Sequence, residues 1–589
     1  MRIRPAEAHL LAFTALFAVL AGFVFWGTWS TSACPVMPDA RMTYPEAGYI
    51  ADIIRGWLST GKFTPWDVTS FLGSPYLWQE LQYALAAYFA ALGLVYYLRG
   101  RGVSHVPSYG AALFLGFCGY WLSLFSAGHA GWFRWMTFGV FAFGLADRAV
   151  RKGKMKNWAL LGATVAWASF YQTDLWLLFT VFTAAYFVWC CIRERKLPQW
   201  KGLAVAAAVF FAIGAPSFRS AIVNDLAGRD KQIEESKGSA LSGGKQVDDR
   251  EARWIFVTNW SLPPAETFEF FIPRLNGDTS CQSVLGLGNS QGTGVRPYTG
   301  ALGRPINATR GNYRQHSLYV GWITCLMALA GIVFARKNRE VVFFAAAALL
   351  FWLLSMGRYC EPVYRVVFAL PFGDYLRAPV KWHHLTELCL CVLAGYGLES
   401  LRAWLADAKR LSPRKVAAIV GAVAVVGAAD LARIDKLYCA AIDLSIVQAK
   451  NPAAEEVLKR GGGKVADLLE GGNGLVAWSF GVRRVEMTAN LGDPEVRFIW
   501  ASVEQLNNKG LASWIKAKKA VPAGAYVITK GAVRKAEGRT MNAMLLEVPG
   551  APSKMPKEPE TPPVTAATWL GVLSLLGTVA VSAYGIKKS

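Results

Sequence analysis

The sequence predicts a mainly α-helical protein that crosses a membrane many times and carries a small α/β domain outside it. The first observation is composition, because 53% of the 589 residues are hydrophobic and only 17% are charged, which is too apolar for a set of soluble domains. The second is that apolar runs of spanning length recur along the chain. The third is that clusters of Lys and Arg fall on alternate connections between these runs.

The apolar runs predict about twelve transmembrane helices. They lie at 8–29, 80–98, 109–127, 131–147, 157–173, 175–192, 202–219, 316–335, 341–357, 380–400, 415–433 and 565–585. The first run follows Arg2 and Arg4, as in a signal peptide, but its length predicts a retained anchor. A lipoprotein cleavage site before Cys34 is the alternative, although the aliphatic residue usual three positions earlier is replaced by Thr31.

The basic clusters predict the orientation of the spans, because Lys and Arg collect on cytoplasmic connections. They are Arg2 with Arg4, Arg99 with Arg101, and the residues at 148–156, 193–201, 336–339, 402–415 and 587–588. We therefore expect both termini in the cytoplasm of a bacterial cell, and function on the extracytoplasmic face, where the longer polar connections lie. The formal charge of +22 is explained by these flanking residues, and no motif predicts a nucleic-acid partner.

Composition divides the chain into a transmembrane domain at 1–433, an extracytoplasmic segment at 434–564 and a last transmembrane helix at 565–589. Within the first part, outer loops are expected at 30–79 and 220–315. The segment 434–564 is rich in Gly and charged residues. Its strand-like runs at 474–478 and 524–528 and its helix-like run at 452–460 predict the small α/β domain.

Four cysteines lie outside the predicted spans, namely Cys34, Cys281, Cys360 and Cys439. In an oxidising compartment they allow up to two disulfides, and their spacing does not choose among the pairings. No Cys and His spacing is typical of a zinc site, so no metal or other cofactor is predicted, although a divalent metal is not excluded.

The first outer loop contains the main catalytic candidate. Thr43 and Glu46 form a capping box that begins a helix, and apolar residues on one face predict that this helix lies flat on the membrane. Glu46 is interpreted as a cap and Asp52 as a solvent-facing residue. Asp39 precedes the helix and has no evident cap or ion-pair role, so it is the candidate general base, with a plain surface aspartate as the alternative.

Other candidate residues are predicted at the same face. His129 and Arg134 lie at a tight outer turn, and Asp174 lies at the outer end of a span, where an N-cap role is the alternative. Two cations four residues apart, Arg377 and Lys381, suit a phosphate, with snorkelling at a helix end as the alternative. His383 and His384 follow them directly.

Several passages between residues 8 and 402 occur in an order that resembles a known family. They are PDARMTYPEAGY, GKFTPWDVTSFLGSP, FSAGHAGWF, TNWSLPPAETFEFFIPRLNG, YRQHSLYVGW, LLSMGRY and LRAPVKWHHLTELCLCVLAGYGLE. The family is that of the YfhO-like bacterial membrane proteins, within the GT-C class of polytopic glycosyltransferases. The resemblance implies inverting transfer of a sugar from a polyprenyl-phosphate carrier to an envelope glycopolymer, lipid or protein on the extracytoplasmic face.

The resemblance also implies a role for Asp39, which would deprotonate the acceptor hydroxyl. The other roles are predicted from position within that reading. Arg377, Lys381 and His384 would bind the lipid phosphate, and His129, Arg134, Asp174 and Trp260 would line the sugar or acceptor pocket, with plain loop packing as the alternative for Trp260. The expected partners are the lipid-linked sugar, membrane lipids, an envelope acceptor, and a separate donor-synthesising enzyme and flippase.

Other functions remain open at this point. A transporter or flippase for a lipid-linked sugar also fits many spans, but no internal repeat is evident and the middles of the spans lack charges. A ligase or polymerase that uses lipid-linked sugars is expected to carry key arginines in a large outer loop. A non-catalytic protein of envelope assembly is the remaining alternative.

Overall fold

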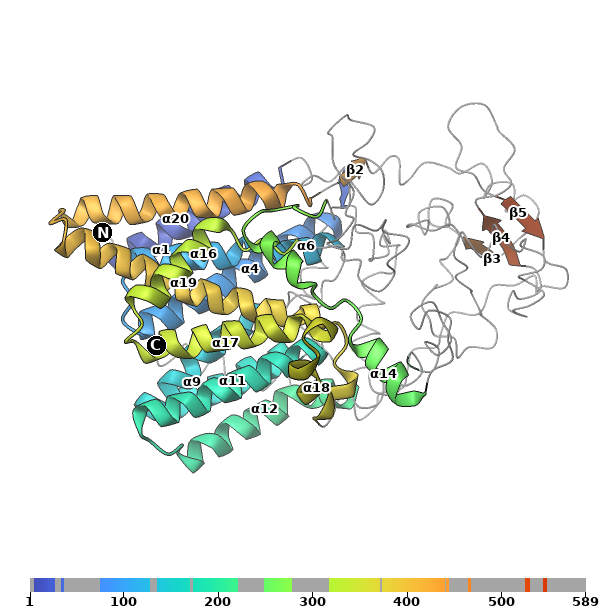
Figure 1. The fold of residues 1–589 in the computed structure, drawn as a ribbon, viewed down its shortest axis with the longest axis horizontal. Coiled ribbons are helices and arrows are strands. Elements are labelled where there is room, and N and C mark those ends of the chain that lie inside the picture. Colours follow the sequence, from blue (N-terminus) through green and yellow to red (C-terminus); the bar gives the residue numbers. More distant parts are fainter. Residues whose placement is uncertain are drawn as a thin grey trace. The chain divides into compact units, whose positions relative to one another are not determined.

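The computed structural model describes residues 5–26, 33–35, 75–127, 135–169, 173–220, 233, 248–277, 317–370, 373–439, 441–443, 464–467, 525–529 and 544–547. This part of the protein is mainly helical (Figure 1). The chain divides into two compact units. The first comprises residues 1–26, 50–439 and 563–589, and the second comprises residues 27–49 and 440–562.

α-Helices of different lengths make up most of the described part of the first unit. They are α1 (Pro5–Val24), α4 (Pro75–Gly100), α5 (His105–Gly116), α6 (Gly119–Ala127), α8 (Met136–Gly139), α9 (Phe141–Lys152), α10 (Met155–Ala168), α11 (Thr173–Glu194), α12 (Trp200–Ser220), α14 (Asp249–Val257), α16 (Trp322–Phe334), α17 (Arg339–Ser355), α18 (Glu361–Ala369), α19 (His383–Asp407) and α20 (Pro413–Lys436). Short 3₁₀ helices lie at Pro264–Phe270, Gly357–Cys360, Gly373–Tyr375 and Pro379–Trp382.

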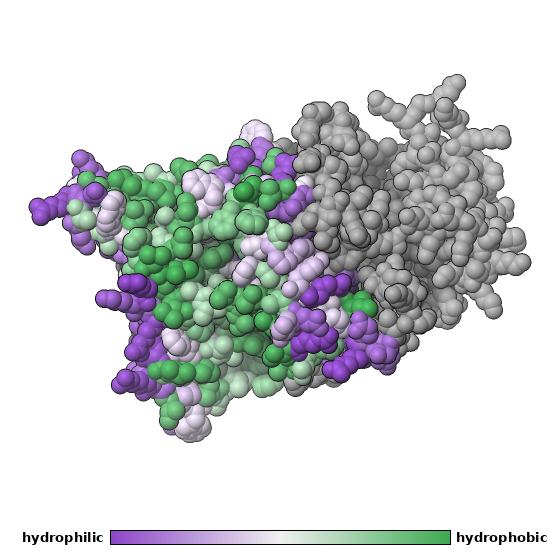
Figure 2. Space-filling view, in the orientation of Figure 1, coloured by the Kyte–Doolittle hydropathy of each residue, from purple (hydrophilic) through white to green (hydrophobic). Residues whose placement is uncertain are grey.

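Six helical segments in the described part are long and apolar enough to cross a membrane, or seven if one bent pair counts as a single span. Two shorter apolar helices lie at Trp200–Ala215 and Trp322–Phe334. Hydrophobic side chains cover the sides of the helices, and hydrophilic ones gather where the helices end (Figure 2). The protein is therefore a multi-pass membrane protein by helix length and hydropathy.

The helices differ from the predicted runs at several breaks. The run predicted at 109–127 is interrupted between α5 and α6, where the Gly119 amide donates to the Tyr319 carbonyl at 3.1 Å instead of continuing the helix. The run predicted at 131–147 includes the short helix α8 and the first part of α9, which continues to Lys152. The final span predicted at 565–585 lies outside the described residues.

The connection between the runs predicted at 341–357 and 380–400 is largely helical in its described part. Helix α17 and the segment Gly357–Ala369 that follows it are bent by 113°. The bend occurs at Gly357, which has a left-handed φ of 48°, and Pro362 stands in the first turn of α18, where its missing N–H costs no helical hydrogen bond. Neither the bend nor α18 was predicted, because both depend on where the chain packs after α17.

Helices α16 and α19 approach closely through small residues. A Cβ on Gly397 would overlap the carbonyl oxygen of Met327, and one on Gly331 would overlap that of Leu393. Small residues permit such close backbone contact between membrane helices, where dispersion attraction rather than water exclusion favours packing.

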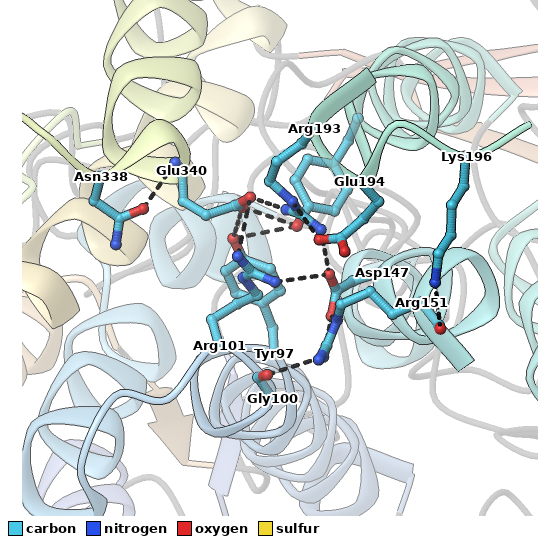
Figure 3. Close-up of polar contacts among 11 residues, drawn as sticks. Tyr97, Gly100, Arg101, Asp147, Arg151, Arg193, Glu194, Lys196, Asn338 and Glu340 are labelled. Carbon is cyan, nitrogen blue, oxygen red and sulfur yellow. Dashed lines mark hydrogen bonds and ion pairs between the residues drawn. The ribbon is translucent and has the colours of Figure 1, made fainter. Parts of the chain in front are cut away.

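A buried network of ionic side chains joins α4, α9, α11 and α17 at one end of the first unit (Figure 3). Arg193 Nη2 lies 2.6 Å from Asp147 Oδ1, and the same arginine contacts Glu340 through Nη1. Arg101 Nη1 lies 3.1 Å from Asp147 Oδ1. Asp147 is 1% exposed and Glu340 is fully buried, so each carboxylate depends on these arginines for charge compensation.

Two tyrosines complete the network. Tyr97 OH donates to Glu340 Oε2 at 2.5 Å, and Tyr186 OH donates to the same oxygen at 2.9 Å. Arg151, at the end of α9, donates to Asp147 Oδ2 from Nε at 2.9 Å. The basic connections predicted near 99–101, 148–156, 193–201 and 336–339 therefore meet at one end of the helices, as the alternating charge pattern predicted.

The second unit contains short strands in the part that is described. Strand β1 (Ala33–Pro35) pairs antiparallel with β2 (Ala441–Asp443), with Cys34 opposite Ile442. Strand β4 (Ala525–Thr529) lies between β3 (Lys464–Asp467), to which it is parallel, and β5 (Met544–Glu547), to which it is antiparallel. Strand β1 thus belongs to the second unit together with β2.

Strand β4 includes residues 525–528 of the strand-like run predicted at 524–528. The strand predicted at 474–478 and the helix predicted at 452–460 lie outside the described residues.

Candidate functional site

Three of the passages singled out in the sequence are joined by backbone hydrogen bonds. The Leu262 amide donates to the Ser355 carbonyl at 2.9 Å, which joins TNWSLPP to LLSMGRY. The Val380 amide donates to the Trp260 carbonyl at 3.3 Å, which joins TNWSLPP to LRAPVKWHHL. Passages about a hundred residues apart in the chain therefore form one unit of structure.

Arg358 and Gly357 make further contacts between LLSMGRY and TNWSLPP. Arg358 donates from its backbone amide to Ser261 Oγ at 3.1 Å and from Nε to the Thr258 carbonyl at 3.1 Å. Gly357 stands directly over Ser261, so that a Cβ at this position would overlap the Ser261 hydroxyl. The left-handed φ of Gly357 and this close contact both require glycine.

The turn before α19 directs basic residues into the helical unit. Ala378 has a left-handed φ of 62°, which costs about 1 kcal/mol or more for a residue with a Cβ, and its amide is held by the Val257 carbonyl at 3.1 Å. The 3₁₀ turn Pro379–Trp382 follows and leads directly into α19. As a result Lys381, His383 and His384 are all buried, at 4%, 0% and 1% exposure.

Asp174 and Lys381 form a buried ion pair. Lys381 Nζ contacts Asp174 Oδ2, and each side chain is 5% exposed. Asp174 Oδ1 also accepts a hydrogen bond from the Leu175 amide at 2.9 Å in the first turn of α11, where the helix dipole favours a negative charge. Asp174 therefore lies one residue inside the helix and is not its N-cap.

Aromatic rings surround the two histidines. The Tyr120 ring lies 4.6 Å from that of His384 and 5.0 Å from that of His383, centroid to centroid. Trp121 and Trp135 lie 5.9 and 6.2 Å from His384, and Phe270 lies 4.4 Å from His383. This cage excludes water and holds both imidazoles in place.

Glu387 is a residue of this site that the sequence analysis missed. It is fully buried, and its Oε1 lies 3.5 Å from His383 Nε2, one helical turn away on α19. The sequence did contain a signal for it, because an acidic residue inside an apolar span is a functional candidate by default. Its i,i+4 spacing from His383 also places the two side chains on the same face of the helix. Tyr120, in contrast, is indistinguishable in sequence from other aromatic residues of the spans.

Asp435, near the end of α20, is a second buried acid outside the predicted set. It is 1% exposed, and neither carboxylate oxygen has a hydrogen-bond partner within the described part of the chain. Such a group in a membrane helix is costly to bury, which makes it a functional candidate.

Arg377 and Trp260 form a separate pair. The Arg377 guanidinium lies 4.4 Å from the Trp260 ring centroid and 5.0 Å from that of Phe256, within the range of cation–π attraction. Both residues of the pair are half-buried. The structure thus brings Arg377 to Trp260 and Lys381 to Asp174, and the two cations expected to bind one phosphate have different neighbours.

Three predicted site residues, Asp39, His129 and Arg134, lie outside the described residues. The outer loop predicted at 220–315 is described in part, and its PRLNG turn is closed by Glu269. Glu269 Oε1 accepts from the backbone amide and from Nδ2 of Asn276, both at 3.0 Å. Burial raises the pKa of the Glu269 carboxyl, and the two hydrogen bonds from Asn276 oppose this rise.

The cysteine predictions are tested only in part. Cys360 has a thiol and is not in a disulfide, while Cys281 and the side chain of Cys34 lie outside the described residues. Inside the helices, Cys118 Sγ and Cys391 Sγ are 3.7 Å apart. Among the described residues, no group of three or more His, Cys, Asp or Glu side chains is placed to hold a metal ion.

The fold and these residues define a multi-pass membrane protein with buried acid and base side chains at helix ends. No family model, curated protein or solved structure matches the chain.

Proposed function

We propose that the chain is a membrane glycosyltransferase that moves a sugar from a polyprenyl-phosphate carrier to an envelope acceptor. The observation that carries the proposal is the buried ion pair of Asp174 with Lys381, two candidates that are distant in the sequence, beside the buried His384. The passages that resemble the YfhO-like proteins supply both partners of the adjoining Arg377 and Trp260 pair.

The proposal includes the finer features of the fold. It places about twelve spans in a GT-C-like arrangement, with an extracytoplasmic α/β domain and both termini in the cytoplasm of a bacterial cell. The meeting of Arg101, Arg151 and Arg193 at one end of the helices supports this orientation, because basic residues collect at the cytoplasmic side. Asp174 and Lys381 then lie toward the extracytoplasmic side.

Each residue has a chemical role in the proposed reaction. Asp39 takes the proton of the acceptor hydroxyl, and the oxygen attacks the anomeric carbon. The bond from that carbon to the phosphate oxygen breaks, and the phosphate leaves with the electron pair. Arg377 stabilises the charge that develops on the phosphate, and Trp260 stacks on the sugar ring. Asp174 holds Lys381 in place. Lys381 and His384 lie on the same side of the site and bind the lipid phosphate.

The test uses the purified full chain in lipid nanodiscs with polyprenyl-phosphate-linked hexoses or N-acetylhexosamines and envelope acceptors. We expect turnover by the wild type, loss of turnover in Asp39→Asn, and a large decrease in Arg377→Gln. Arg365→Gln is the matched control, because Arg365 lies in an exposed i,i+4 pair with Glu361. Absence of turnover with every donor would overturn the proposed activity, and full activity of Asp39→Asn would overturn the assignment of the base.

A flippase for a lipid-linked sugar is the second candidate, because Glu387 and Asp435 are buried acids within spans and such acids mark ion pathways in transporters. Reconstituted vesicles distinguish the two functions. A flippase moves labelled donor across the bilayer without breaking the sugar–phosphate bond, whereas a glycosyltransferase releases the polyprenyl phosphate. A non-catalytic assembly protein does neither.

A further inference from the structure

A pocket of about 250 Å³ lies between four helices of the first unit, α1, α5, α19 and α20, near the turn that joins α4 to α5. One wall is formed by His9 of α1 and another by residues 104–107 at the start of α5. The remaining walls come from the end of α19, at Arg402 and Ala406, and from residues 411–420 around the start of α20. None of these residues belongs to the site proposed for sugar transfer.

The pocket has an apolar interior and a polar mouth. Val416 and Val420 line it and are 4% and 0% exposed. At the mouth, the imidazoles of His9 and His105 stack with their centroids 4.9 Å apart. An apolar interior of this kind binds a hydrocarbon chain, whereas a small water-soluble anion has no partners inside it.

The charges around the mouth are mostly positive. Glu399 is fully engaged, since it accepts from the Ser104 amide at 2.9 Å, from Ser104 Oγ at 3.0 Å and from Arg402 Nε at 2.8 Å. The turn between α19 and α20 lines the pocket at Leu411 and carries the exposed Lys409 and Arg410. The first turn of α20 adds the exposed Arg414 and Lys415, against one exposed acid, Asp407, at the end of α19.

The position of the pocket along the helices indicates which class of ligand it binds. It lies where apolar helices end at a basic turn, which is the depth of lipid head groups in a bilayer, and basic pockets between membrane helices on the cytoplasmic side bind anionic head groups. We infer that the pocket binds an anionic phospholipid of the bilayer, with one acyl chain between α1, α5 and α20 and its phosphate at the basic turn. This inference does not depend on the proposed sugar transfer.

The test measures binding of phosphatidylglycerol and phosphatidylcholine with identical acyl chains to the full chain in detergent, by native mass spectrometry. Tighter binding of phosphatidylglycerol is expected. Neutralising both basic residues next to Pro413, as Arg414→Gln with Lys415→Gln, is expected to weaken phosphatidylglycerol binding about fivefold per charge, given about 1 kcal/mol per basic residue. The same double variant should leave phosphatidylcholine binding unchanged.

A second variant tests the acyl-chain site. Ala417 lines the pocket and is exposed, so Ala417→Trp fills the pocket without disturbing the helix core and should weaken both lipids. Val426→Trp is the control, because Val426 is 56% exposed elsewhere on the same helix. Equal affinity for the two lipids, or binding unchanged by Ala417→Trp, would overturn the inference. Preference for polyprenyl phosphate over phosphatidylglycerol would also overturn it, since the occupant would then be a carrier lipid.

Discussion

Lys381 Nζ contacts the Asp174 carboxylate, and this buried pair joins the first turn of α11 to the turn before α19 across 207 residues of chain. Each side chain is 5% exposed. The pair therefore acts both as a structural link and as the charged centre of the candidate site.

Removal of Lys381 is expected to destabilise the protein. Lys381→Met leaves Asp174 as an uncompensated buried charge, which costs about 3 to 5 kcal/mol. The double variant Asp174→Asn, Lys381→Met removes both charges and should recover a large part of this loss. Thermal unfolding in detergent measures the effect, with the exposed Lys415→Met as control. A single variant as stable as the wild type would show that the contact contributes little.

Arg193 is expected to be essential for the ion network of Figure 3. It bridges Asp147 and Glu340, which are almost completely buried, so Arg193→Gln should lower the free energy of unfolding by about 3 kcal/mol or more. Arg193→Lys should recover only part of this, because a lysine ammonium does not span two carboxylates as a guanidinium fork does. Denaturation by sodium dodecyl sulfate measures both, and equal stability of the Lys variant and the wild type would contradict the bridging role.

Gly357 should not tolerate a side chain. Gly357→Ala places a Cβ on the Ser261 hydroxyl in a left-handed conformation, and such strain costs about 1 to 3 kcal/mol. Gly22→Ala in α1 is the control, since nothing lies within 4 Å of its Cβ. We expect a lower melting temperature for the first variant alone. Equal melting temperatures would mean that the junction with Ser261 is not rigid.

Glu269 predicts a dependence of stability on pH. Burial raises its pKa in the folded state above the ordinary value of 4.5. At a pH between 4.5 and the folded-state pKa, the folded protein therefore binds more protons than the unfolded protein. Its contribution to stability is therefore complete below pH 4.5 and is lost as the pH rises through the folded pKa. Melting temperatures from about pH 4 to pH 8 should fall less steeply in Glu269→Gln, which keeps an acceptor for Asn276.

The control for Glu269 is Glu361→Gln, because Glu361 is exposed beside Arg365. If the decrease of melting temperature with pH is unchanged in Glu269→Gln but altered in Glu361→Gln, the pH dependence comes from a carboxylate other than Glu269.

Much of the helical architecture was predictable because it depends on local sequence. Helix α4 covers the run predicted at 80–98, and α20 covers the run predicted at 415–433, since an apolar run of spanning length is helical wherever it lies in a bilayer. The bend after Ser355 was not predictable, because Gly357 permits it while contacts with Ser261 determine it.

The site was predictable only as a set of residues. Asp174 was chosen as a charged residue at the end of a span, Lys381 as one of two cations that suit a phosphate, and His384 because it follows them directly. Glu387 carried the same signal and was missed, and Asp39 remains a prediction outside the described residues.

The sequence by itself therefore determined that the described part is mainly helical with spans of apolar residues, and at which end of the helices the basic residues gather, since hydrophobic length and charge are local properties. Only the tertiary structure decided which groups are partners. It paired Lys381 with Asp174 and Arg377 with Trp260, although Arg377 and Lys381 are four residues apart. The reason is that a buried charge takes whichever partner the packing of distant helices brings within reach, and sequence spacing does not encode that distance.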